Sequence, residues 1–312
     1  MTRFLADMRT MTRSIGEARG RPIRHLVRFF AHRGLEQLRN QVGLDVARWI
    51  EAGSVDLLAP VVSTTVNEHV GAMAEAVRVT GGSDCQVLGS ISEIMSDQFT
   101  QIRPSTEMLQ TANLLYRRAG ASGLHVWWPR EQSAGRDYQR PQDFSLLADM
   151  KSDEVCAQCD KHYLLGDQLP VRLKEGQQYV FSLNVADDLQ EHPGSERRAK
   201  VILVIGLQHF APDDKVVFGL NGEEIPWENF VEPDFPAIWY RVGRLEALLT
   251  GPALRQGMNE IGVKVDRHVP DPEGMTLPDE DPRRPDDLLL TNLELTITHR
   301  GDRSDRTASA PV

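Results

Sequence analysis

In the first half of the chain, short apolar runs alternate with segments that have helical spacing. The apolar runs occupy residues 23–30, 55–62, 86–91 and 124–128. Apolar side chains recur three and four positions apart, as on one helix face, in residues 2–19, 45–53, 67–79 and 106–119. Residues 31–40 are polar and predict a loop. Buried strands that alternate with helices are typical of a parallel sheet covered on both faces.

The second half changes to the period of two that strands require. The predicted strands are residues 178–185, 200–207, 215–220, 237–242, 259–265 and 288–298. Residues 143–165 are predicted to be helical, and residues 242–249 to form a short turn. Many short strands without a long helix between them indicate a β-sandwich or jelly roll.

These patterns predict two different domains and a connector. Residues 1–150 are expected to form the strand–helix domain, 151–170 a helical connector, 171–299 the β-sandwich domain, and 300–312 a disordered tail. A chain of 312 residues exceeds the usual size of one domain, which favours the same division.

The composition and the N-terminal segment argue against certain partners and cellular compartments. The formal net charge of −10 leaves no basic footprint for a nucleic acid. No run of about 18 apolar residues exists to span a membrane. Asp7 and Glu17 interrupt the basic N-terminal segment, so it does not resemble a secretory signal. The chain as written is expected in the cytoplasm, and in the secreted fraction if a longer N-terminus carries a signal peptide.

The three cysteines do not suggest a disulfide framework, because their number is odd. Cys156 and Cys159 have the spacing of metal ligands, and His162 follows them. A second pair of ligands is missing from the sequence, since Cys85 lies far away. Reduced cysteines on a helix are therefore the favoured interpretation, and we expect neither a metal nor a cofactor.

Several segments resemble a known family. Residues 43–49 lead into residues 53–60 as a helix, a glycine and a strand, and residues 116–127 have the character of a closing helix and strand. In the second half, residues 216–222 and 248–260 show a likeness to the same family. Together they resemble bacterial family-10-like glycosylhydrolases, which are TIM-barrel glycoside hydrolases that end in a small β-sandwich.

The resemblance implies a fold and an activity. The implied fold is a partial (β/α) TIM-type barrel of about four strand–helix units, followed by a β-sandwich or jelly roll. The family carries three or four further units upstream, so this chain is expected to lack the N-terminal half of the barrel. The implied activity is acid/base hydrolysis of a glycosidic bond, and we expect the 312-residue chain itself to be inactive.

Glycoside hydrolysis needs two carboxyl groups beside the scissile bond. In TIM barrels such groups lie at the carboxyl ends of strands. Glu93 directly follows the strand predicted at residues 86–91 and is the best candidate for a catalytic carboxylate, with a loop or helix-start role as the alternative. Asp97 is interpreted as a cap or loop residue.

Other residues near strand ends are candidates for binding sugar. Trp127 and Trp128 offer aromatic faces for stacking, although strand alternation turns at most one of them inward. The remaining candidates are Arg28, Asn67 and Glu131, with an ion pair, a helix N-cap and a surface carboxylate as their respective alternatives. His25 shares the strand of Arg28, and His125 is interpreted as a core histidine.

Two functions from different classes therefore compete. The first is a glycoside hydrolase-like protein with a carbohydrate ligand. The second is a non-catalytic carbohydrate-binding or assembly module. In both cases a half barrel would leave two strand edges unpaired, so self-association through these edges is expected.

Overall fold

The chain folds into two units. The computed structural model describes residues 1–31, 34–61, 66–92, 95–96, 101–102, 105–127, 150, 152–165, 168–189, 199–211, 213–231, 242–249, 254–269 and 288–299. Contacts divide the chain into a first unit, residues 1–156, and a second unit, residues 157–312. Within the described helices, none is long and apolar enough to cross a membrane.

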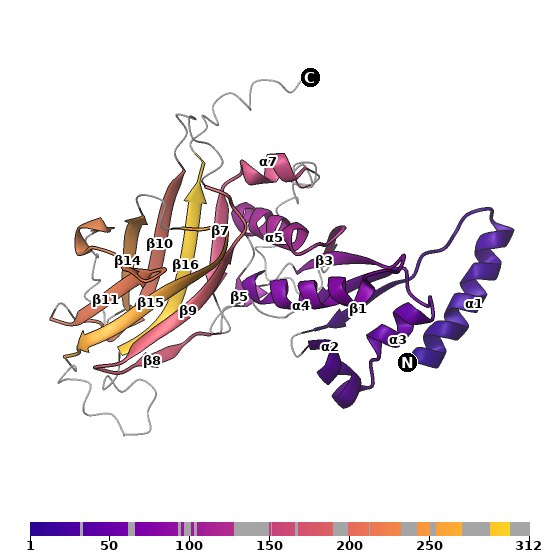
Figure 1. The fold of residues 1–312 in the computed structure, drawn as a ribbon, viewed down its shortest axis with the longest axis horizontal. Coiled ribbons are helices and arrows are strands. Elements are labelled where there is room, and N and C mark those ends of the chain that lie inside the picture. The colour runs from indigo at the N-terminus through magenta and orange to yellow at the C-terminus, as the bar shows by residue number, and fades with distance from the viewer. Residues whose placement is uncertain are drawn as a thin grey trace, which may run out of the picture. The chain divides into compact units, whose positions relative to one another are not determined.

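The first unit is built on a parallel sheet (Figure 1). Its strands are β1 (Leu26–Phe30), β2 (Leu57–Val61), β3 (Gln86–Ser92) and β6 (Gly123–Trp127). They lie in the order β1-β2-β3-β6, and every neighbouring pair is parallel. The prediction of four parallel strands in sequence order is therefore confirmed. A separate two-residue ladder joins β4 (Met95–Ser96) to β5 (Gln101–Ile102) in the antiparallel sense.

The helices of the first unit follow the predicted periodicity within two residues at each end. They are α1 (Thr2–Ala18), α3 (Val46–Glu51), α4 (Val66–Thr80) and α5 (Thr106–Arg118). Side-chain caps fix two helix starts, because the Asp45 carboxylate accepts from the Arg48 amide and the Ser105 hydroxyl accepts from the Met108 amide.

The polar loop predicted for residues 31–40 contains two short helices. These are α2 (Gly34–Gln37) and the π-helix η1 (Leu38–Val42). Leu35 and Leu38 are buried in the core, and Gly43 ends the second helix with a left-handed φ of 73°. Two leucines among many polar residues gave too weak a pattern to predict these turns.

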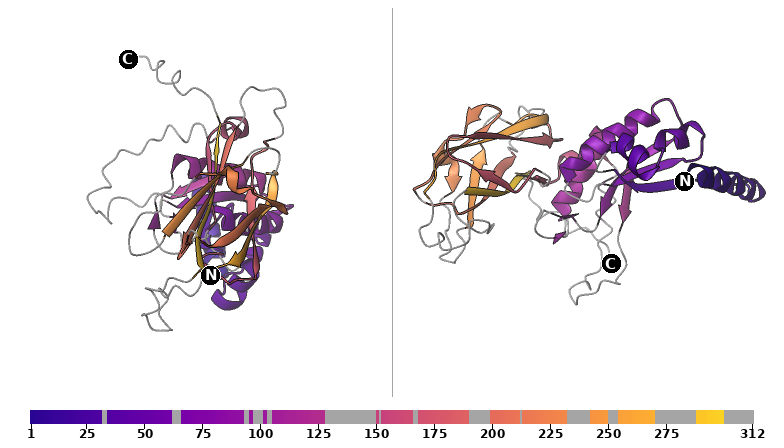
Figure 2. Two further views of the ribbon diagram at one scale, coloured as in Figure 1. Left: turned by 90° about the vertical axis from the view of Figure 1, so that its left-hand side faces the viewer. Right: turned by 90° about the horizontal axis from the view of Figure 1, so that it is seen from below.

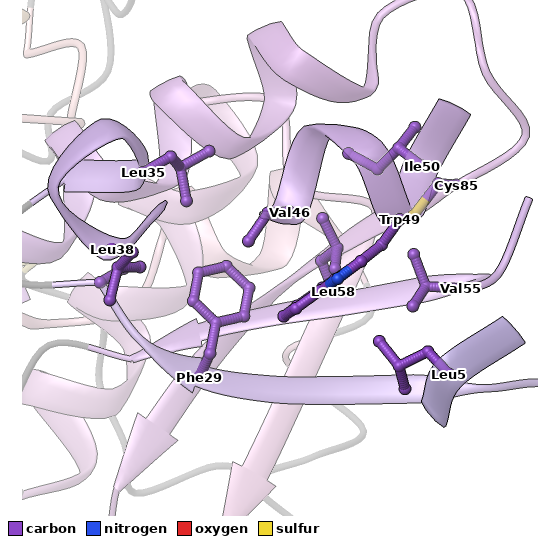
Figure 3. Packing of buried hydrophobic residues seen from close by; sticks show 11 residues of the cluster. Leu5, Phe29, Leu35, Leu38, Val46, Trp49, Ile50, Val55, Leu58 and Cys85 are labelled. Atoms are coloured by element: carbon purple, nitrogen blue, oxygen red, sulfur yellow. The ribbon is translucent and has the colours of Figure 1, made fainter. Parts of the chain in front are cut away.

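The core of the first unit lies between one face of the sheet and the helices (Figure 3). Phe29 and Leu58 point from β1 and β2 toward Val46 and Trp49 of α3. Trp49 is 1% exposed, and its indole N–H donates to the Thr2 hydroxyl over 3.0 Å. The start of α1 is thereby attached to the same core.

A polar cluster joins α1 to the residues that directly precede β1 and β2. Arg9 donates two hydrogen bonds to the carboxylate of Asp56, at 2.5 and 2.7 Å. The His25 amide donates to the same carboxylate over 2.6 Å. Burial alone would raise the pKa of Asp56, but the hydrogen bonds from Arg9 and His25 outweigh it and hold the pKa below its usual value.

The segment after residue 149 covers the polar side of α5. The Asn113 amide donates to the Met150 carbonyl and to the thiol sulfur of Cys156, which in turn donates to the Gln110 side chain. Arg117 forms an ion pair with Asp153 of α7 (Asp153–Ala157). These contacts bury Gln110 and Asn113, so that all residues from 108 to 116 are buried and not only the apolar face that the sequence indicated.

The second unit consists of two antiparallel sheets (Figure 2). The larger sheet has the order β13-β14-β10-β16-β7, with β8 also paired to β16. Its strands are β7 (Lys161–Leu165), β8 (Val171–Leu173), β10 (Lys200–Gln208), β13 (Phe230–Val231), β14 (Val242–Leu249) and β16 (Leu288–Thr298). The smaller sheet has the order β12-β11-β15-β9. Its strands are β9 (Gln178–Val185), β11 (Lys215–Leu220), β12 (Glu223–Glu224) and β15 (Gly257–Arg267).

Alternate side chains along these strands are buried, as the period of two predicted. In β9, Phe181, Leu183 and Val185 are buried, and β11 and β15 show the same alternation. Strand β10 differs, because its central residues are buried on both faces.

Two segments of the second half differ from their predictions. Residues 161–165 form a strand paired with β16, although a helical connector was predicted there. Residues 242–249 form β14, a full strand between β10 and β13, and not a short turn. The strand predicted at residues 237–242 lies outside the described residues except for Val242.

The helix that was predicted to carry both Cys156 and Cys159 ends before the second of them. Cys156 lies in α7 and is buried, whereas Cys159 follows the helix and is partly exposed. His162 lies in β7, where its imidazole hydrogen-bonds to Glu294. The described part of the chain holds no group of three or more potential metal ligands.

Candidate functional site

The two faces of the parallel sheet differ in chemistry. The register pairs Arg28 with Ala59 and Ser90 with His125, so these residues share one face. The opposite face, which carries Phe29, packs against the helices. The face of Arg28 is therefore the one turned away from this apolar core, and we call it the polar face; Ala59 and Ser90 on it are buried, whereas Arg28 and His125 are partly exposed.

Two strands place hydrogen-bonding side chains together on the polar face. The Ser90 hydroxyl of β3 lies 3.2 Å from Nδ1 of His125 on β6. Arg28 of β1 has its guanidinium carbon 5.6 Å from the centre of the Phe30 ring, which lies two residues further along the same face. Ser90 is fully buried, whereas Arg28 and His125 are half-buried.

The electrostatics connect Arg28 to His125. Burial lowers the pKa of His125, and the positive charge of Arg28 lowers it further. Burial also lowers the pKa of Arg28, although a guanidinium keeps its proton in proteins. At neutral pH the polar face thus offers a fixed cation and a neutral imidazole, which together can donate to and accept from hydroxyl groups.

The parallel strands define where ligand-binding groups would gather. Because all four strands run in the same direction, their carboxyl ends, at Phe30, Val61, Ser92 and Trp127, lie at one edge of the sheet. The register places Trp127 beside Ser92. Ser92 is the residue before Glu93, so the predicted catalytic carboxylate directly follows a strand end.

The structure describes the positions of some of the predicted site residues. Arg28 lies on the polar face, and Asn67 lies in the first turn of α4. Trp127 ends β6. Glu93, Trp128 and Glu131, together with Asp97, lie outside the described residues.

The sequence interpretation missed one residue of the polar face, Ser90, and assigned another, His25, to the strand of Arg28. Ser90 was not among the candidates, because its place beside His125 depends on the register between β3 and β6, which no local pattern specifies. His25, considered together with Arg28, precedes β1 and is buried. Its imidazole hydrogen-bonds to Thr12 and to the carbonyl of Ser54, so it joins α1 to the loop before β2.

The second unit presents an aromatic group on its surface. Trp227, in the 3-10 helix η2 (Trp227–Asn229), is 45% exposed. Its ring lies 4.9 Å from that of Phe230 and 6.0 Å from that of Phe218, measured between centroids. Phe218 is buried, so the indole is supported from below and open to solvent.

Comparisons with known proteins find distant structural neighbours. No family model and no curated protein matches the chain. A family 86 glycoside hydrolase in complex with neoagarooctaose is similar to this chain with 14% identity and a TM-score of 0.28, covering 46% of this chain and 19% of its own. A β-porphyranase of the same family from Bacteroides plebeius has 14% identity, a TM-score of 0.27 and coverages of 46% and 21%.

A two-domain esterase active on acetylated mannans is similar over more of its length. It has 10% identity and a TM-score of 0.24, and the alignment covers 88% of this chain and 79% of the esterase. The chain spans about a fifth of the length of the two family 86 structures. At these TM-scores the likenesses carry no argument about activity, so the functional conclusion has to come from the residues of the chain.

Proposed function

We propose that this chain is a glycoside hydrolase-like protein that binds a carbohydrate at the carboxyl ends of its parallel strands. The observation that carries the proposal is the polar face, on which Ser90 lies beside His125 and Arg28 lies beside the aromatic ring of Phe30. A sugar presents hydroxyl groups at its rim and C–H groups on its faces, and it therefore fits a surface of polar donors beside an aromatic ring.

The same edge of the sheet is where the catalytic groups of the resembled family would lie. In the proposal, Glu93 is the acid, base or nucleophile, and Trp127, Trp128, Asn67 and Glu131 contribute to the sugar-binding rim. The strand order β1-β2-β3-β6 supports a partial TIM-type barrel, because neighbours in a barrel follow one another in sequence. The two antiparallel sheets support the β-sandwich.

The test is a calorimetric titration of the purified chain with neutral oligosaccharides: mannohexaose, cellohexaose and neoagarohexaose. We expect at least one to bind, and Arg28→Met to weaken that binding about tenfold, which corresponds to about 1.4 kcal/mol. The matched control is Arg24→Met, which removes an exposed arginine just before β1. Equal affinity of the Arg28 variant and the wild type would contradict a site on the polar face.

A second candidate function is a non-catalytic carbohydrate-binding module in the second unit. The observation that favours it is Trp227, whose exposed indole rests on Phe218 and Phe230. The same titration separates the two candidates. Binding that is lost in Trp227→Ala and kept in Arg28→Met would assign the ligand to the second unit.

Self-association is part of the proposal. Among the described strands, β1 pairs only with β2, and β6 only with β3, so each leaves one edge of the parallel sheet open. Leu26 and Phe30 are 39% and 53% exposed on the polar face. We expect light scattering after gel filtration to give a mass above that of one chain, increasing with concentration. A single-chain mass at all concentrations would contradict this expectation.

A further inference from the structure

A cavity of about 320 Å³ lies between the C-terminal half of α1 and the turn that follows it. Arg9 and Arg13 line it from the helix, and Arg21, Pro22 and Ile23 line it from the turn. Three arginines around one cavity stand out in a chain whose net charge is −10. The size is within the range of small-molecule sites.

The end of α1 explains why these arginines converge. Arg9, Arg13 and Gly16 are four and three positions apart, so they share one helix face. Gly20 has a φ of 65°, its amide donates to the Glu17 carbonyl, and the amide of Arg21 donates to the Gly16 carbonyl. These two bonds form a Schellman motif, which reverses the chain and brings Arg21 back over the helix.

Gly16 allows the returning segment to approach closely. A Cβ atom at this position would lie 2.9 Å from the Arg21 carbonyl oxygen and 3.4 Å from the Ile23 nitrogen. The turn therefore packs against helix backbone, which fixes the position of the cavity wall. A preformed wall lowers the entropic cost of holding a ligand.

The charges around the cavity are only partly balanced. Arg9 is held by two hydrogen bonds to Asp56, which neutralises its charge. Arg13 and Arg21 form no ion pair with any residue that the structure describes. Glu17 is the one carboxylate of the lining. The balance leaves a net positive cavity with two guanidinium groups available to a ligand.

We infer that this cavity binds a small molecule through an oxyanion: a phosphate, sulfate or carboxylate group. The planar guanidinium presents paired donors that match two oxygens of such a group. Pro22 and Ile23 add apolar wall for the remainder of the ligand. The inference does not depend on the proposed carbohydrate function, because it concerns other residues at the amino-terminal side of β1.

The test is calorimetric titration of the full chain with pyrophosphate in a buffer free of phosphate and sulfate. We expect saturable binding at one site per chain, weakened at least fivefold by Arg13→Met and by Arg21→Met. Arg19→Met and Arg24→Met are matched controls, since they remove the same charge from exposed positions outside the lining. Glu17→Gln should strengthen binding, because it removes the one carboxylate of the cavity.

Three outcomes would overturn the inference. The first is the absence of saturable binding to pyrophosphate, sulfate and citrate. The second is an equal loss of affinity in all four arginine variants, which would show a general charge effect. The third is binding only to vesicles that contain phosphatidylglycerol, since exposed Phe4, Met11 and Ile15 on α1 would then indicate a membrane surface as the ligand.

Discussion

Replacement of Lys161 by methionine is expected to lower the free energy of unfolding of the second unit by about 3 to 5 kcal/mol. Lys161 begins β7 and is 1% exposed. Its ammonium group lies 3.3 Å from a carboxylate oxygen of Asp187 and donates to the Cys159 carbonyl over 2.6 Å. Without the lysine, the buried carboxylate of Asp187 would lose its nearest cation and keep the His299 imidazole at 3.7 Å, and the loss of that cation is the source of the cost.

The surrounding groups make this ion pair part of a network. The Tyr163 hydroxyl donates to Asp187 and accepts from the Ala186 amide. Burial, and then the neighbouring charge of Asp187, raise the pKa of Tyr163 well above its usual value, so it stays a donor. Since Asp187 follows β9 and Lys161 starts β7, the network ties the smaller sheet to the larger one.

The measurement is urea unfolding followed by circular dichroism. Lys264→Met is the matched control, because Lys264 pairs with Asp266 at 2.6 Å on the surface, where both side chains are more than two-fifths exposed. Its loss should cost less than about 1 kcal/mol. The double replacement Lys161→Met with Asp187→Leu should recover much of the loss. Similar midpoints for the two lysine variants would show that the buried pair does not stabilise the unit.

Local periodicity was enough to find most of the elements. The strands predicted at residues 178–185, 215–220 and 288–298 have the same bounds in the structure. These segments alternate apolar and polar residues because one face of each strand is buried and the other is not. Helix ends were also predictable where a cap was present, as at Asp45.

Non-local pairing decided the segments that the sequence did not predict. Residues 242–249 are rich in leucine, with alanine and glutamate, which favour helices, yet they form β14 between two other strands. Residues 161–165 are too short to show a period, and their partner β16 lies more than 120 residues away. In both segments the tertiary contacts outweigh the intrinsic preference of the chain.

The residues of the candidate site could be predicted from the sequence only in part, because non-local pairing brings some of them together. Arg28 could be selected because a charged residue within an apolar run needs an explanation. The pairing of Ser90 with His125 depends on the register between β3 and β6, which no local pattern specifies. The arginine cavity depends on the reversal of the chain at Gly20, which brings together residues from two sides of a turn.

Replacement of Gly89 by alanine is expected to lower the free energy of unfolding of the first unit by about 1 to 3 kcal/mol. A Cβ atom at Gly89 of β3 would lie 2.2 Å from Cδ2 of Tyr116 and 2.8 Å from its Cβ and Cγ. Tyr116 is 1% exposed on α5, so its ring has no open space into which to move. Either β3 or α5 must therefore shift.

Gly71→Ala serves as the control, because a Cβ atom there would meet nothing within 4 Å. It lies inside α4, where alanine should stabilise the helix by about 0.5 to 1 kcal/mol. The two alanine substitutions thus have opposite expected signs in the same urea titration. A shift of β3 would also move Ser90 away from His125, so Gly89→Ala should weaken oligosaccharide binding if the ligand lies on the polar face. A Gly89 variant as stable as the wild type would mean that β3 and α5 pack less tightly than these distances indicate.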